Sequence, residues 1–76
     1  MKYPLTDMDM ENLNNRFTYH APKDDQAKRY ERMRDCAKEL ATLYYENVPD
    51  SRERSLAFTW LETSIMWANA GIARNE

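Results

Sequence analysis

The protein is a chain of 76 residues, of which 42% are hydrophobic and 32% charged, and its net charge is −2. A single domain of this size buries only about 60 to 65% of the surface that its unfolded chain exposes, so it would be marginally stable as a monomer. Its one cysteine excludes an internal disulfide, its one histidine excludes the common metal-ligand clusters, and it has no long apolar run or signal-peptide pattern. We therefore expect a single cytosolic domain, residues 1–76, with no cofactor, metal or membrane segment.

One glycine and three prolines leave little material for turns or strands, so the composition predicts an all-α fold. Residues 1–16 predict a short N-terminal helix, for which Thr6 is a suitable N-cap. A helix of about ten residues is marginal in isolation, so we expect it to form by packing on the rest of the chain. Met8, Leu13 and Phe17 are the side chains predicted to dock it.

Residues 17–23, FTYHAPK, predict an extended connector, because the residue before Pro22 is disfavoured from the helical conformation. Apolar residues then recur with a period of 3.6 through residues 24–47, which predicts a helix of about six turns. Asp24 or Asp25 is the predicted N-cap of this helix.

A last helix is predicted over residues 51–75. Asp50 is its predicted N-cap, and Glu53 is placed three residues later, where it could close a capping box. The link 47–50 is short, and two long helices joined by a short link normally pack as antiparallel neighbours. The sequence thus predicts a long antiparallel helical hairpin.

The last helix carries more apolar surface than one neighbouring helix can cover. At 100° per residue its small and apolar side chains fill an arc of roughly 180°, wider than the stripe of about 100° typical of a surface helix. The arc comprises Leu56, Ala57, Trp60, Leu61, Ser64, Ile65, Trp67, Ala68, Gly71 and Ile72. Because Trp60 and Trp67 lie at one edge of the arc, we expect a second copy of the chain to cover it, so that the protein is a homo-oligomer.

The sequence offers little that could catalyse a reaction. His20 has no serine or cysteine partner in a known catalytic order, and there is no HExxH motif or glycine-rich phosphate loop. Cys36 is interpreted as a small core residue, as free cysteines commonly are. Gly71 lies within a predicted helix, where it would allow another helix to approach closely. We therefore expect a binding protein and not an enzyme.

Three segments carry a resemblance to a known family. These are FTYHAP at 17–22, RYERMR at 29–34, and SRERSLAFTWLETSIMWANAGIARNE at 51–76. They resemble the phage anti-CBASS cyclic-nucleotide sponges, whose hairpin domain is shared with the anti-Thoeris sponges. The resemblance implies a hairpin that assembles into a hexamer and sequesters cyclic dinucleotides such as cGAMP between protomers, without cleaving them, in the cytoplasm of the infected bacterium. Some members also bind cyclic trinucleotides at a second site.

The resemblance also implies roles for two residues. Tyr19 matches the tyrosine that stacks on the ligand base, and Arg34 matches a basic residue that acts with it, although other members have lysine there. Independently of the family, Tyr19 could instead fasten the connector to the hairpin, whereas Phe17 is expected to pack inward. The full predicted ligand-binding set is Tyr19, His20, Pro22, Lys23, Arg34, Ser51, Arg52, Ser55, Thr59 and Arg74.

Several of these residues have structural alternatives. The polar residues at the start of the last helix could serve capping and solvation, and Asn69 could be a buried polar residue that fixes helix register. Arg29 and Arg32 are interpreted as surface ion-pair partners. Residues 23–38 hold six basic and four acidic side chains, but the negative charge of the whole chain argues against duplex DNA or RNA as a partner. A phage helical adaptor that binds a protein through its apolar face is the alternative function.

Overall fold

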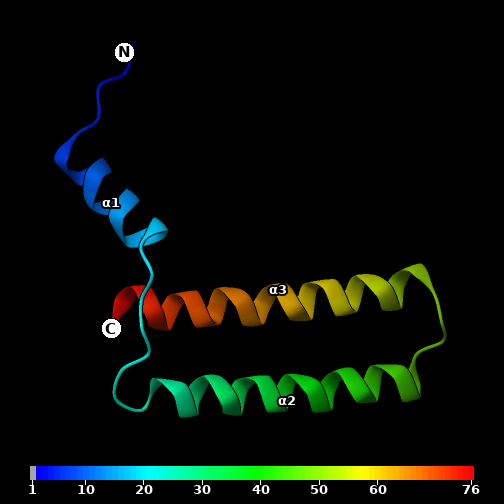
Figure 1. Ribbon diagram of the computed structural model, residues 1–76. Helices are drawn as coiled ribbons and strands as arrows, with labels where there is room; N and C mark the ends of the chain where they lie inside the picture. Colours follow the sequence, from blue (N-terminus) through cyan, green and yellow to red (C-terminus); the bar gives the residue numbers. More distant parts are fainter. Residues whose placement is uncertain (1) are drawn as a thin grey trace.

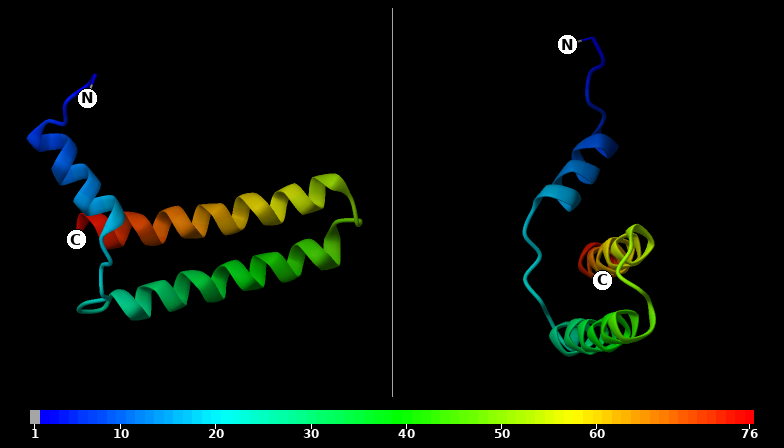
Figure 2. Two further views of the ribbon diagram at one scale, coloured as in Figure 1. Left: turned by 45° about the horizontal axis from the view of Figure 1, so that its top comes forward. Right: turned by 90° about the vertical axis from the view of Figure 1, so that its right-hand side faces the viewer.

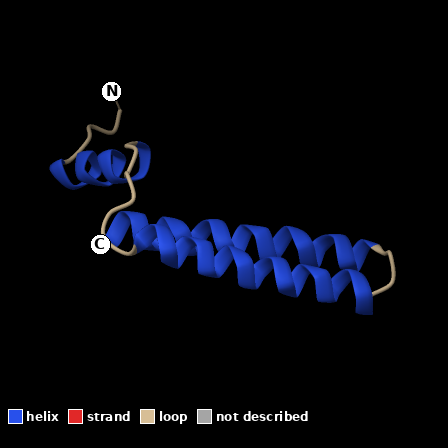
Figure 3. Ribbon diagram, turned by 60° about the horizontal axis from the view of Figure 1, so that its bottom comes forward, coloured by secondary structure: helices blue, strands red, loops and turns tan. Residues whose placement is uncertain are grey.

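A computed structural model describes residues 2–76 as three α-helices without a β-strand in that range (Figure 3). The helices are α1 (Asp7–Phe17), α2 (Gln26–Asn47) and α3 (Arg52–Asn75). Figure 1 shows α2 and α3 antiparallel and side by side, with α1 projecting from the end at which α3 finishes. The predicted all-helical fold is confirmed.

The first helix begins with a complete capping box. The Thr6 hydroxyl accepts a hydrogen bond from the Asp9 amide at 3.1 Å, and the Asp9 carboxylate accepts one from the Thr6 amide at 2.9 Å. The bond from the Thr6 amide lowers the pKa of Asp9 because it favours the ionised carboxylate. These contacts satisfy two amides that would otherwise lack partners, so a helix of 11 residues is supported locally.

The second helix begins without the predicted aspartate cap. Asp25 occupies the N-cap position but makes no capping hydrogen bond, and its carboxylate lies instead 3.2 Å from Arg29 Nε as an ion pair. Asp24 adopts a left-handed backbone conformation, with φ of 52°. The Gln26 side chain provides a partner for a backbone amide of the turn, since its Oε1 accepts a hydrogen bond from the Lys23 amide at 3.1 Å. The predicted N-cap position is confirmed for Asp25, but neither its side chain nor that of Asp24 makes the expected capping hydrogen bond.

The N-cap of the third helix lies one residue later than predicted. Ser51 is the N-cap, and its hydroxyl accepts a hydrogen bond from the Arg54 amide at 3.1 Å. Asp50 lies outside the helix, where its carboxylate is 3.2 Å from Arg54 Nη2. The same guanidinium donates to the Val48 carbonyl at 3.1 Å and stacks over the Tyr45 ring at 5.0 Å. The predicted capping box of Asp50 and Glu53 is therefore wrong. The Ser51 hydroxyl caps the helix, and Arg54 binds the Asp50 carboxylate and the Val48 carbonyl in the link.

The hairpin is held by one apolar seam. Half-buried side chains of α2 face those of α3, and Phe58 packs against two tyrosine rings, with centroids 5.8 Å from Tyr44 and 4.5 Å from Tyr45. Two helices cannot enclose a side chain on all sides. Accordingly, no hydrophobic residue in 2–76 is fully buried, and Gln26 is the one buried residue in that range.

The first helix stands apart from the hairpin (Figure 2). Met8 is 70% exposed and Phe17 is 80% exposed, so the predicted docking of α1 on its own hairpin is wrong for the single chain. Phe17 likewise does not pack inward. Cys36 is also exposed, contrary to its interpretation as a core residue, because this hairpin has no enclosed core. The extended backbone after α1 carries that helix away from the hairpin, which leaves its apolar face free.

Candidate ligand-binding site

The connector between α1 and α2 presents an aromatic ring to solvent. Thr18 continues the chain in an extended conformation, and the Tyr19 side chain after it is 84% exposed. The next side chain is fixed, because His20 Nε2 donates a hydrogen bond to the Asn15 carbonyl at 2.7 Å. Pro22 and Lys23 follow as exposed residues. The connector can therefore offer the face of a tyrosine ring for stacking.

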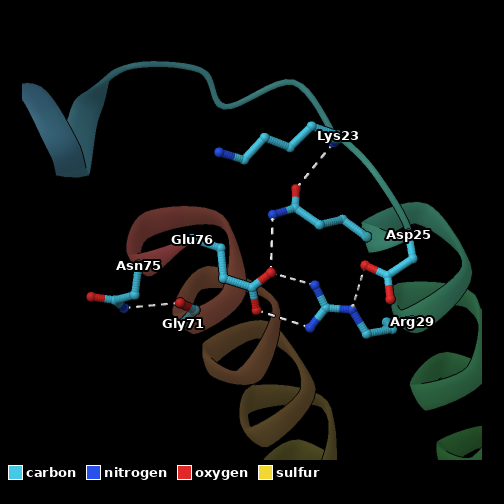
Figure 4. Close-up of polar contacts among 7 residues, drawn as sticks. Lys23, Asp25, Arg29, Gly71, Asn75 and Glu76 are labelled. Carbon is cyan, nitrogen blue, oxygen red and sulfur yellow. Dashed lines mark hydrogen bonds and ion pairs between the residues drawn. The ribbon is translucent and has the colours of Figure 1, made fainter.

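A polar cluster ties the connector to both long helices (Figure 4). We call Lys23, Gln26, Arg29 and Glu76 the hairpin clamp. Gln26 Nε2 donates to Glu76 Oε1 at 3.4 Å, Arg29 Nη1 donates to Glu76 Oε2 at 2.9 Å, and Arg29 Nη2 pairs with Glu76 Oε1. The hydrogen bonds from Arg29 lower the pKa of Glu76, and the same contact raises the pKa of Arg29. Arg29 thus forms ion pairs with Asp25 and Glu76, which confirms its interpretation as an ion-pair partner.

An open, mainly apolar groove of 360 Å³ is lined by residues of α2 and α3, among them Arg34. Lys38 of α2 is a second cation in the lining, and Glu62 of α3 is its one carboxylate. The other lining residues are Ala37, Ala41, Phe58, Leu61, Ile65 and Met66. Arg34 is exposed and forms no ion pair with any carboxylate in residues 2–76, so its guanidinium is accessible to a ligand.

The predicted polar residues at the start of α3 are largely committed to local contacts. Ser51 caps the helix and its hydroxyl donates to the Pro49 carbonyl at 2.9 Å, while Thr59 donates to the Ser55 carbonyl at 3.1 Å. Arg52 is exposed. The capping interpretation is confirmed for Ser51, and no contact assigns a ligand to these side chains.

Most of the predicted site residues lie near one of the two ends of the hairpin, and Arg34 lies between them. A helix of 24 residues spans about 36 Å, and this length separates the start of α3 from Arg74. Arg74 lies near the connector end, with its guanidinium 5.9 Å from the centroid of Trp67. Arg34 lies eight residues into α2, about 12 Å along the helix from the connector. One chain therefore does not gather the predicted residues into a single pocket.

The sequence-based prediction missed the hairpin clamp. Gln26 follows Lys23 by three residues, which is the spacing of a capping box and was a usable local signal. Glu76 offered no such signal, since its partner Arg29 is 47 residues earlier in the chain. Asn69 is half-buried, and its Oδ1 has no hydrogen-bond partner among residues 2–76.

Among residues 2–76, no three histidine, cysteine or acidic side chains come close enough to hold a metal ion. None of the helices in this range combines the length and the hydrophobicity that a membrane crossing requires.

The fold defines a class of small proteins built on an antiparallel helical hairpin. Residues 9–73 match the family model described as Acb2/Tad1, hairpin domain, and the chain belongs to this family of anti-CBASS and anti-Thoeris sponges. Members of the family are sponge-type anti-defence proteins, which bind their targets and are not enzymes. Neither the curated proteins nor the solved structures contain a match to the chain.

Proposed function

We propose that the protein assembles into a homo-oligomer, a hexamer by analogy with the family, that binds cyclic dinucleotides between protomers and holds them intact. Acting in the cytoplasm of an infected bacterium, it would deprive the effectors of CBASS immunity of their signal. The observation that carries the proposal is the 84% exposure of Tyr19 in a chain that belongs to the sponge family. A tyrosine ring that no other ring of residues 2–76 covers is available for stacking on a nucleobase, an interaction of about 1 to 3 kcal/mol per base.

The separation of the predicted residues supports a site shared between chains. Tyr19 lies on the connector, and Arg34 lies within α2, where it lines the open groove. A second chain related by a two-fold axis would bring one copy of each residue to the other. Such a site would present two tyrosines and two arginines, which matches the two bases and two phosphates of a cyclic dinucleotide.

The lack of an enclosed core supports assembly. Large apolar side chains on α3 remain in solvent, among them Trp60 and Trp67, each 66% exposed. Contiguous exposed apolar surface of this kind is typical of interaction sites. Association of several hairpins would cover it and would place Tyr19 of one copy beside another copy.

The proposal is tested by release of bound ligand. The purified chain is incubated with 3′,3′-cGAMP, other cyclic dinucleotides and cyclic trinucleotides, and is then denatured by heat so that the released compounds can be identified. Intact ligand after heating supports a sponge, whereas an altered product would indicate an enzyme. Absence of any bound nucleotide would refute the proposal and favour an adaptor that binds protein through α3.

The residues are tested by calorimetric titration of Tyr19→Ala and Arg34→Ala with the dinucleotide that binds. Each variant is expected to bind about tenfold to a hundredfold more weakly, because it loses a stacking or a charge-assisted contact. Arg32→Ala removes an equally exposed arginine of α2 and serves as the matched control. Unchanged affinity in both variants, with oligomer size preserved, would mean that the site lies elsewhere. Arg74 is the first residue to test for the second site at which some family members bind cyclic trinucleotides; if that site exists here, Arg74→Ala is expected to weaken trinucleotide binding.

A further inference from the structure

Gln26 is the most enclosed side chain of the described residues, although it lies at the beginning of a helix. It is 3% exposed, whereas Ala27 beside it is exposed. A buried amide must find hydrogen-bond partners, and the side chain of Gln26 has one on the connector and one after α3, namely the Lys23 amide and the Glu76 carboxylate. A single side chain therefore connects three segments of the chain.

The connector is consequently fixed on both sides of Tyr19. On the α1 side, His20 donates to the Asn15 carbonyl at 2.7 Å. On the α2 side, the Lys23 amide donates to the Gln26 side chain and the Lys23 carbonyl accepts from the Gln26 amide at 3.0 Å. Only three residues, 20–22, separate the exposed ring of Tyr19 from the anchor at Lys23, and Pro22 restricts the backbone among them.

The backbone at the turn shows why an anchor is needed. Asp24 has φ of 52°, a left-handed conformation that is strained for a residue with a side chain. Such a conformation persists where the surroundings hold it. The contacts that hold it here are the hydrogen bonds between Lys23 and Gln26, reinforced by the bonds of Glu76 to Gln26 and Arg29.

We propose that Gln26 and Glu76 are positioning residues for Tyr19, which hold the connector in the conformation that presents the tyrosine ring to a nucleobase. The inference rests on the proposed function. Its physical basis is preorganisation: a segment that is ordered before binding does not lose conformational entropy when the ligand arrives. Neither positioning side chain needs to contact the ligand.

The test uses Gln26→Met, which retains length and helix propensity but removes both hydrogen bonds of the amide. The first readout needs no ligand: exchange of the Lys23 amide hydrogen, followed by NMR, is expected to accelerate about tenfold when its acceptor is lost. Affinity for 3′,3′-cGAMP, or for the cyclic dinucleotide that the release experiment identifies, is expected to fall about three- to tenfold. Asn47→Met is the matched control, because Asn47 is an exposed amide of α2 that bonds only to Leu43, at the far end of the hairpin.

A double-mutant cycle separates positioning from general destabilisation. If Gln26 acts through the Tyr19 ring, Gln26→Met should change affinity by less than about twofold in a Tyr19→Ala background. An equal loss in both backgrounds would overturn the inference, as would unchanged affinity or unchanged exchange at Lys23. Glu76→Ala repeats the measurements with an intact Gln26, so the inference stays testable if Gln26→Met does not fold. A wild-type chain that binds no nucleotide refutes the proposed function, whereas wild-type binding with unaffected variants refutes only the positioning role.

Discussion

Replacing Trp67 with alanine is expected to weaken assembly far more than it weakens the single hairpin. Trp67 is 66% exposed in the chain, so its ring contributes little to the seam between α2 and α3. A buried tryptophan removes up to about 250 Å² from water, of which about two-thirds, or about 165 Å², remains for a partner chain to cover. At about 25 cal/mol per Å², this area corresponds to about 4 kcal/mol per copy, an upper estimate because alanine retains part of the contact.

Sedimentation velocity over a dilution series measures the effect. The wild-type chain is expected to sediment as an oligomer at micromolar concentration, and Trp67→Ala is expected to dissociate at concentrations at least about a hundredfold higher. Tyr3→Ala is the control, since Tyr3 is an aromatic residue of similar exposure, 78%, outside the hairpin. A wild-type monomer at micromolar concentration, or a Trp67→Ala variant that assembles as the wild type does, would refute the reasoning.

Two further predictions concern stability. Asn69→Leu is expected to raise the melting temperature, because Asn69 Oδ1 is buried without a hydrogen-bond partner in residues 2–76. Such an unpaired acceptor costs about 1 to 3 kcal/mol of folding free energy. The melting temperature is measured at a fixed chain concentration, and a lower value would show instead that Asn69 has a partner in the assembly or fixes the helix register. The hairpin clamp should open in acid: the pKa of Glu76 is below its ordinary 4.5, so its stabilising effect is complete above pH 4.5 and is lost as the pH falls through the lowered value. NMR titration of the Glu76 carboxylate checks this, with Glu76→Gln, which has no carboxylate at this position, as the control. A Glu76 carboxylate that titrates at its ordinary pKa would contradict the prediction.

Local sequence signals predicted the helices because the interactions that form them act over a few residues. The period of 3.6 through α2 and α3 reflects which side chains share a face, and Thr6 before α1 caps it through a contact three residues away. The short link 47–50 likewise predicted the antiparallel hairpin, because few residues join the two helices and hold their ends close together. The exact cap of α3 was harder to predict, since Asp50 and Ser51 both suit the position and the choice depends on Arg54 taking the carboxylate.

The apolar arc of α3 was predicted correctly as more surface than one helix can cover. The structure leaves Trp60 and Trp67 in solvent, because α2 covers only the seam side of α3. The sequence did not reveal that α1 would project away from its own hairpin. The apolar residues Met8 and Phe17 identify the face of α1 that needs a packing partner, but they do not identify whether the same chain or another copy provides it.

The sequence by itself determined the helical fold and the family, and it suggested the two residues on which the ligand proposal depends. The tertiary structure decided which residues are anchored: Gln26 became the most buried side chain and Glu76 acquired its partners because the antiparallel packing of α2 and α3 brings together groups 47 to 50 residues apart. No local pattern encodes such a contact. It arises only when two helices of nearly equal length end side by side, which places the acceptor that follows one helix next to the donors that begin the other.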